Sequence, residues 1–161
     1  MVAAAAAVPP DARTRPGPRN GNGIYSNEQH ATARVLTHVA RARAAAAGEA
    51  GREAAERELR AAVALEDAMA YMEPPYVHAP VRHCLGKQLL DAGRPGAAEE
   101  VYREDLARHP DNGWALLGLH QSLAAQRNHA EAQLVLARFQ RAWRHADTLL
   151  ASSCPAFHSG S

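Results

Sequence analysis

Apolar side chains recur at steps of three and four residues through most of the chain, the spacing that gathers them on one face of an α-helix. Predicted helices cover about residues 26–47, 52–69, 78–92 and 96–108, then a fifth follows Asp111 and a long sixth runs from about 129 to 151. No segment makes a convincing strand, because none alternates apolar and polar residues over enough positions. We therefore expect an all-α fold.

Helix boundaries are marked by residues that favour helix ends. Residues 26–29, Ser-Asn-Glu-Gln, have the form of a capping box, and Gly48 and Gly51 flank the first turn. Pro95 suits the first turn of the fourth helix, and the side-chain oxygen of Asp111 can cap the fifth. The six helices therefore pair as three antiparallel hairpins with short turns.

Successive hairpins repeat one another in their small residues. Gly86 and Gly118 each follow a leucine and lie 32 residues apart, and Ala98 and Ala132 lie 34 residues apart. A helix–turn–helix unit repeated at this period predicts a stack in which each hairpin packs on its neighbours.

With this period and these residues, the chain resembles the tetratricopeptide repeat family over about residues 27–150, and in particular the C-terminal repeats of longer members. The resemblance implies a short right-handed solenoid, in which glycine and alanine allow close helix approach and an aromatic residue fills the groove between hairpins. The long C-terminal helix would cap the stack. Arg82 departs from the pattern, since an aromatic residue is usual there. The residues that carry the resemblance are Leu85, Gly86, Leu89, Ala98, Tyr102 and Pro110 in the middle unit, and Trp114, Leu117, Gly118 and Ala132 in the last unit.

The resemblance implies a non-enzymatic scaffold that binds a protein or peptide in a concave groove lined by the first helix of each hairpin. The residues at the groove positions of this chain do not reproduce the carboxylate clamp of chaperone-binding members. Lys87 with Arg82 would still favour an acidic partner segment. The alternative is a non-catalytic terminal module of a larger multi-domain protein or enzyme. Carried over by position, the partner-binding residues are His83, Lys87, Asp91, Asn112, Leu119 and Ser122.

Composition and charge narrow the class of partner. Apolar residues make up 47% of the chain, many of them alanine, and the net charge is +1 with histidine neutral. A nucleic-acid binder would carry a strongly basic surface, so we expect a protein partner and no nucleic acid. No apolar run approaches the roughly 20 residues that span a bilayer. We expect no membrane span and a cytoplasmic protein.

The chain ends divide from the repeat domain by composition. Residues 1–25 are rich in alanine and proline and predict a disordered leader, residues 26–151 the helical repeat domain, and residues 152–161 a flexible tail. The arginines of residues 1–20 leave a second interpretation open, an organelle transit peptide. The segment 73–76, Glu-Pro-Pro-Tyr, is either a rigid spacer or an element at the rim of the groove.

Catalytic and metal chemistry find little support. No nucleophile motif or phosphate loop is present, and we expect no cofactor. Two cysteines are too few for a disulfide scaffold, so we expect reduced thiols, with Cys84 in the core. A metal or thiol function at His78, His83 and Cys84, beside Glu73, is a further hypothesis. The two histidines are offset by about 140° on a helix, which disfavours a shared metal.

Overall fold

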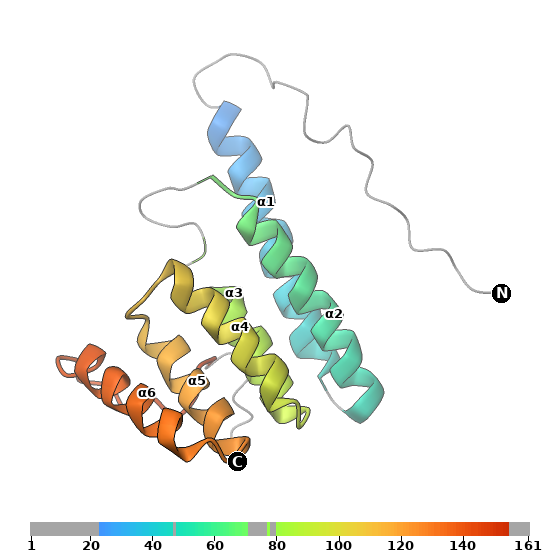
Figure 1. The fold of residues 1–161 in the computed structure, drawn as a ribbon. Helices are drawn as coiled ribbons and strands as arrows, with labels where there is room; N and C mark the ends of the chain where they lie inside the picture. Colours follow the sequence, from blue (N-terminus) through green and yellow to red (C-terminus); the bar gives the residue numbers. More distant parts are fainter. Residues whose placement is uncertain (1–22, 47, 71–76, 78–79, 155–161) are drawn as a thin grey trace.

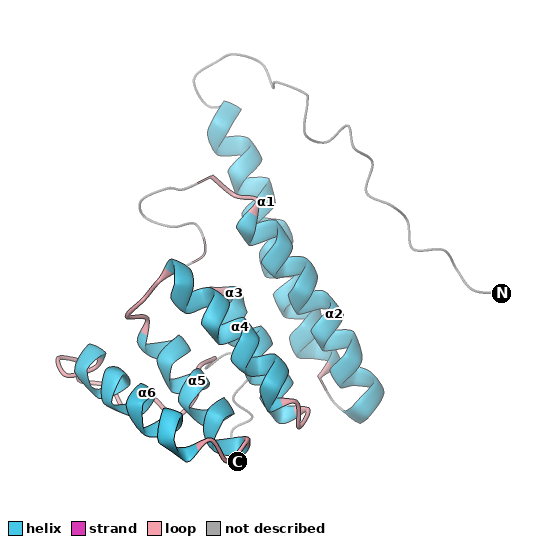
Figure 2. Ribbon diagram, viewed as in Figure 1, coloured by secondary structure: helices cyan, strands magenta, loops and turns pink. Residues whose placement is uncertain are grey.

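The fold is all-helical over the described part of the chain, as the sequence predicts. The computed structural model describes residues 23–46, 48–70, 77 and 80–154. No strand occurs in these ranges (Figure 2). The helices are α1 (Gly23–Ala45), α2 (Gly48–Asp67), α3 (Val81–Asp91), α4 (Pro95–Arg108), α5 (Gly113–Ala125) and α6 (His129–Ala142).

Consecutive helices pack against each other and form three hairpins, α1–α2, α3–α4 and α5–α6 (Figure 1). The hairpins stack in chain order, since α2 contacts α3 and α4 contacts α5. Helix α3 also contacts α5, so the first helices of the second and third hairpins lie side by side. The predicted stack of three hairpins is confirmed. None of the helices described has the length and hydropathy needed to cross a membrane.

Tyr102 is the central packing residue between the second and third hairpins. Its ring is fully buried, and a Cβ placed on Gly86 or Gly118 would lie 2.4 or 2.1 Å from its Cζ atom. The ring therefore lies between α3 and α5, and both positions must be glycine to leave room for it. The two glycines thus make room for the Tyr102 ring between the second and third hairpins.

Two predicted helix starts are wrong. Helix α1 begins at Gly23, so Ser26 lies within the helix and not at its start. Asn112, and not Asp111, caps α5: its side-chain oxygen accepts hydrogen bonds from the backbone N–H groups of Trp114 and Ala115, at 3.0 and 3.4 Å. Both asparagine and aspartate suit this position, so only the backbone path selects between two adjacent candidates.

The predicted long C-terminal helix is also wrong, because α6 ends at Ala142. The Trp143 ring packs against Gly113 so closely that a Cβ added to this glycine would lie 2.4 Å from the ring. The same ring packs edge-on against Trp114. Its indole N–H donates a hydrogen bond of 2.8 Å to the carbonyl of Thr148. These contacts hold the chain in a turn, and it then runs back toward α3.

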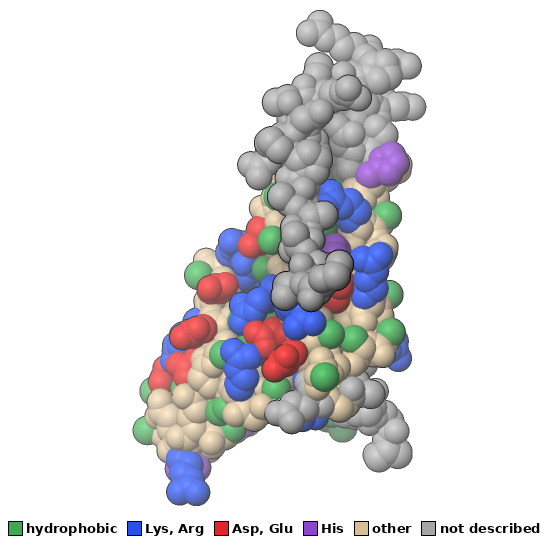
Figure 3. Space-filling model, turned by 90° about the vertical axis from the view of Figure 1, so that its right-hand side faces the viewer, with side chains coloured by type: hydrophobic (Ala, Val, Ile, Leu, Met, Phe, Trp, Pro, Cys, Tyr) green, Lys and Arg blue, Asp and Glu red, His purple; other side chains and the backbone are tan. Residues whose placement is uncertain are grey.

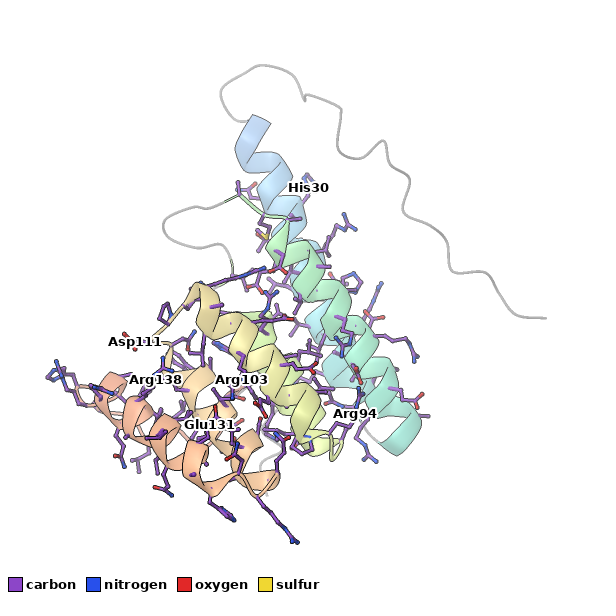
Figure 4. All side chains as sticks on the ribbon, viewed as in Figure 1. His30, Arg94, Arg103, Asp111, Glu131 and Arg138 are labelled. Atoms are coloured by element: carbon purple, nitrogen blue, oxygen red, sulfur yellow. A yellow bond between two sulfur atoms is a disulfide. The ribbon has the colours of Figure 1, made fainter. Side chains whose placement is uncertain are left out.

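Ion pairs join the hairpins to each other. Asp67 at the end of α2 binds Arg82 of α3 through two hydrogen bonds, of 2.5 and 2.6 Å, and also binds Arg108 of α4. The hydrogen bond from Arg82 is the main reason that the pKa of Asp67 lies below its usual value. Arg103 of α4 and Glu131 of α6 form a similar link, and Figure 4 shows them between these two helices. On the face seen from the α2 side, basic and acidic side chains are interspersed (Figure 3).

Candidate partner-binding face

One side of α3 carries Cys84, Lys87 and Asp91, which are spaced by three and four residues and therefore lie above one another. The side chain of Lys87 is partly exposed and its ammonium binds the Asp91 carboxylate one turn along, which is itself exposed. Helices α2, α4 and α5 pack against the other sides of α3. The predicted residues Lys87 and Asp91 are thus accessible together on one face.

His83 does not share that exposed position. Its side chain is buried, with Nε2 3.2 Å from an Asp105 carboxylate oxygen and 3.1 Å from the amide nitrogen of Asn112. The imidazole therefore joins α3 to α4 and to the cap of α5. Asn112 is partly exposed, and its side chain both caps α5 and contacts the His83 ring.

Leu119 and Ser122 of α5 also point into the core. Both are buried, at 2% and 0% exposure, and the Ser122 hydroxyl donates a hydrogen bond of 2.8 Å to the carbonyl of Gly118. The expectation that these two side chains and His83 face an open groove does not fit their burial. The side of α5 that stays accessible to solvent carries Trp114, which is 39% exposed, and Gln121, which is partly exposed and lies seven residues further along the helix.

Residues 152–154, which we name the closing segment, lie against this face. Cys154 forms a disulfide with Cys84, with a Cα–Cα distance of 4.9 Å. The Ser153 hydroxyl lies 2.6 Å from the Tyr102 hydroxyl and donates a bond of 3.3 Å to the carbonyl of His83. All three residues of the segment are buried.

Two predictions from the sequence are corrected by the closing segment. The cysteines are bonded, not reduced, and residues 152–154 belong to the packed structure, not to a flexible tail. The even number of cysteines was the available signal, but a separation of 70 residues gives no indication that their Cα atoms approach within bonding range. Residues 155–161 and the leader 1–22 lie outside the described residues.

The hydroxyl of Tyr102 is a polar group in an otherwise apolar position. Burial raises its pKa well above the usual value, and the hydrogen bond to Ser153 opposes this rise only in part. The hydroxyl therefore keeps its proton at neutral pH and can both donate and accept a hydrogen bond.

Arg82, which we expected to act with Lys87 on an acidic partner, is held elsewhere. Its guanidinium is bound by Asp67 and is buried. It lines a cavity of about 310 Å³ between α2 and α4, together with apolar residues such as Leu85 and Val101. Arg82 thus fixes the junction of the first two hairpins and does not lie beside Lys87 on the exposed side of α3.

Metal chemistry gains no support from the described ranges, and the free Cys84 thiol of that hypothesis does not occur there. Within them, no group of three or more histidine, cysteine, aspartate or glutamate side chains could hold a metal ion. Cys84 is in a disulfide. The other members of that hypothesis, His78 and Glu73, lie outside the described residues, as does the whole segment 73–76.

Comparison with known proteins gives one match, which lies in the second half of the stack. Residues 89–144 match a family model described as a tetratricopeptide repeat. The matched region runs from the end of α3 through α4, α5 and α6. Comparison with curated proteins and with solved structures found no match.

Proposed function

We propose that the chain, which carries a tetratricopeptide repeat over residues 89–144, is a non-enzymatic scaffold that binds a protein or peptide on the face formed by α3 and α5. Repeats of this type support protein–protein interaction in general. The observation that carries the proposal is the closing segment. This face already holds a short stretch of polypeptide, residues 152–154, through side-chain and backbone hydrogen bonds.

The residues proposed to contact a partner are those that stay accessible around the closing segment. Lys87 and Asp91 lie on α3, Asn112 caps α5, and Trp114 and Gln121 lie along α5. Since the Lys87 ammonium is bound by Asp91, a partner carboxylate would have to displace that ion pair. Trp114 offers a partly exposed aromatic surface without such competition.

A cross-linking experiment tests this face directly, because Lys87 is the only lysine of the chain. An amine-reactive, photoactivatable cross-linker on Lys87 should capture a partner from a native extract, and Trp114→Ala should reduce that capture. The matched control is a Lys87→Arg/Arg141→Lys variant, which moves the single lysine to the exposed side of α6. Equal capture from both positions, unaffected by Trp114→Ala, would exclude the α3–α5 face as the binding site.

The outer side of α1 favours the second candidate, a terminal module of a larger protein. This side exposes small and apolar residues at helical spacing, with Leu36 55% exposed. Arginines border the stripe, and residues 29–45 contain no acidic residue. Such a side suits an acidic helix of a further domain. The exposed residues of the stripe are Ala33, Leu36, Thr37, Ala40 and Ala44, and the bordering arginines are Arg34, Arg41 and Arg43.

Separate variants distinguish the two candidates. Ala40→Glu places an acid in the middle of the α1 stripe and should weaken association with an acidic helix, while cross-linking from Lys87 stays unchanged. The control Ala125→Glu places the same charge on an exposed position of α5. If Ala40→Glu leaves every association of the protein intact, the α1 side is solvated and the second candidate fails.

A further inference from the structure

Building on the proposed function, we propose that the face between α3 and α5 is a binding site for an extended segment in which a serine precedes a cysteine. Ser153 and Cys154 occupy this site in cis. When they leave it, the site accepts a segment of the same chemistry from another protein. The site consists of the Tyr102 hydroxyl, the His83 carbonyl and the Cys84 sulfur.

The position of Tyr102 makes the hydroxyl part of the site. The residue belongs to α4, yet its distal ring atoms lie between Gly86 of α3 and Gly118 of α5. The hydroxyl therefore reaches past the two glycines to the side where the closing segment lies, and meets Ser153 there at 2.6 Å. In the absence of a ligand hydroxyl, this buried polar group would lose its partner, which costs more than an exposed hydrogen bond would.

The carbonyl of His83 is the second polar element of the site. It accepts a hydrogen bond of 3.3 Å from the Ser153 hydroxyl, while the His83 ring is directed to Asp105 and Asn112. One serine hydroxyl thus lies within hydrogen-bond distance of two fixed groups that come from different helices. Ser153 itself is 1% exposed, so a larger side chain does not fit without displacing the segment.

The residues on either side of Ser153 indicate which ligand residues the site would prefer before and after the serine. The Ser152 hydroxyl accepts from the backbone N–H of Cys154 at 3.2 Å and donates to its carbonyl at 3.3 Å. This local turn directs the cysteine sulfur toward Cys84. A ligand of Ser-Ser-Cys type therefore has a role for each residue: the first shapes the segment, the second binds Tyr102 and His83, and the third bonds Cys84.

The covalent step is an ordinary thiol–disulfide exchange. A small thiol in excess first reduces the Cys84–Cys154 disulfide by two successive exchanges and is itself oxidised to its disulfide. The freed Cys84 thiolate then attacks the cysteine sulfur of a ligand that is itself part of a disulfide. A sulfur–sulfur bond forms between Cys84 and the ligand, the ligand's former disulfide bond breaks, and the leaving thiolate takes up a proton. No other oxidant is required, because one disulfide replaces another.

The test uses the full chain carrying Ser153→Glu and Cys154→Ser. A glutamate cannot remain in the buried position of Ser153, so the closing segment leaves and Cys84 becomes the only thiol. The probe is an N-acetylated peptide with the sequence of residues 149–154, Leu-Leu-Ala-Ser-Ser-Cys, whose cysteine carries a 2-pyridyl disulfide. The absorbance of released pyridine-2-thione gives the rate of exchange.

We expect this peptide to react at least tenfold faster than a control with the same composition and the same terminal cysteine, Ser-Leu-Ala-Ser-Leu-Cys. Changing the second serine of the probe to alanine should slow the reaction about fivefold, the effect of one lost hydrogen bond. In a chain that also carries Tyr102→Phe, the serine and alanine probes should differ less, because the contact between the two hydroxyls is already absent. Purely structural burial of Tyr102 would leave the difference unchanged.

Equal rates for the native and control peptides would overturn the proposal, as would a serine effect that is independent of Tyr102. If circular dichroism shows that the Ser153→Glu/Cys154→Ser chain is unfolded, the same rates are measured on the Cys154→Ser chain, where Cys84 is again the only thiol and the probe must displace the tethered segment. The assay contains no cellular partner. Its failure would therefore remove the serine–cysteine preference alone, while cross-linking from Lys87 decides the proposed function.

Discussion

The first hairpin and the two that follow are built differently. Helices α1 and α2 are 23 and 20 residues long and pack through small aliphatic residues such as Val35, Ala55 and Leu59. Helices α3 to α6 have 11 to 14 residues, and they enclose Tyr102, a buried histidine and a disulfide. The family match covers residues 89–144, outside the first hairpin.

This difference shows two ways to hold a helical hairpin in a stack. Long helices make many contacts with each other, so the first hairpin needs few special residues. Short helices make fewer contacts, and the later hairpins are joined by groups that cross from one hairpin to the next, namely Tyr102 between two glycines and the closing segment on Cys84. We expect mutations to separate these two regions as follows.

The largest effect should come from opening the disulfide. Cys154→Ser removes a link that closes 70 residues of chain, which corresponds to about 4 kcal/mol of unfolding free energy in the chain-entropy model. The loss should be measurable as a shift of the urea midpoint, and reducing agent should bring the wild type to the same value. Hydrogen exchange should rise in α3 to α5 and stay unchanged in α1. A uniform rise would mean that the first hairpin depends on the closing segment as well.

The next effect should come from Gly118→Ala. The new Cβ would lie 2.1 Å from the Tyr102 ring, and such overpacking costs about 1–3 kcal/mol. The matched control is Gly96→Ala on α4, where the nearest atom is a flexible glutamine oxygen at 3.5 Å and stability should be unchanged or slightly raised. Equal thermal denaturation midpoints for the two variants would show that Tyr102 can move aside.

A smaller effect is expected at the junction of the two regions. Asp67→Asn weakens the bond to Arg82 and should cost about 2 kcal/mol, the range for a charged hydrogen bond. The pKa of Asp67 is lowered from 3.8 in the folded chain, chiefly by the hydrogen bond from Arg82. The contribution of Asp67 to the free energy of unfolding is therefore complete above about pH 3.8. It is lost as the pH falls through the lower pKa that Asp67 has in the folded chain.

The pH dependence of urea unfolding checks this sign. Between about pH 5 and pH 2 the stability of the wild type should fall more steeply than that of Asp67→Asn. The neighbouring Glu66 has the opposite pH dependence and serves as the control. Burial raises its pKa in the folded chain, so its contribution to the free energy of unfolding decreases as the pH rises. Parallel curves for wild type and Asp67→Asn would show that the pair with Arg82 adds nothing to stability.

The smallest effect should lie within the first hairpin. Glu58 lies 2.6 Å from the His38 ring, at a partly exposed position between α2 and α1. Partly exposed pairs of this kind contribute up to about 1 kcal/mol. Glu58→Gln should therefore change the denaturation midpoint by no more than about 3 °C, measured beside the exposed control Glu53→Gln on α2. A larger drop would mean that the first hairpin also relies on a specific polar contact.

The candidate site shows where sequence inference is weakest. Lys87 and Asp91, carried over by position like the other candidates, lie on an accessible side of α3, and their role in partner binding stays a prediction. His83, Leu119 and Ser122 were placed on an open face by analogy of position, whereas the structure buries them. A helix rotated by part of a turn exposes different residues, and that rotation depends on what its neighbours contribute. Trp114, expected only to pack, is partly exposed for the same reason.

By itself, the sequence determined the helices, their pairing in hairpins and the repeat that stacks them, since periodic apolar residues, turn residues and the spacing of small residues act locally or recur at fixed intervals. Only the tertiary structure decided that α6 ends at Ala142, that Cys84 meets Cys154, and that Ser153 lies beside Tyr102. These outcomes join residues far apart in the chain. They depend on the three-dimensional path between them, because a disulfide or a buried hydrogen bond forms only when packing brings its atoms within a few ångströms.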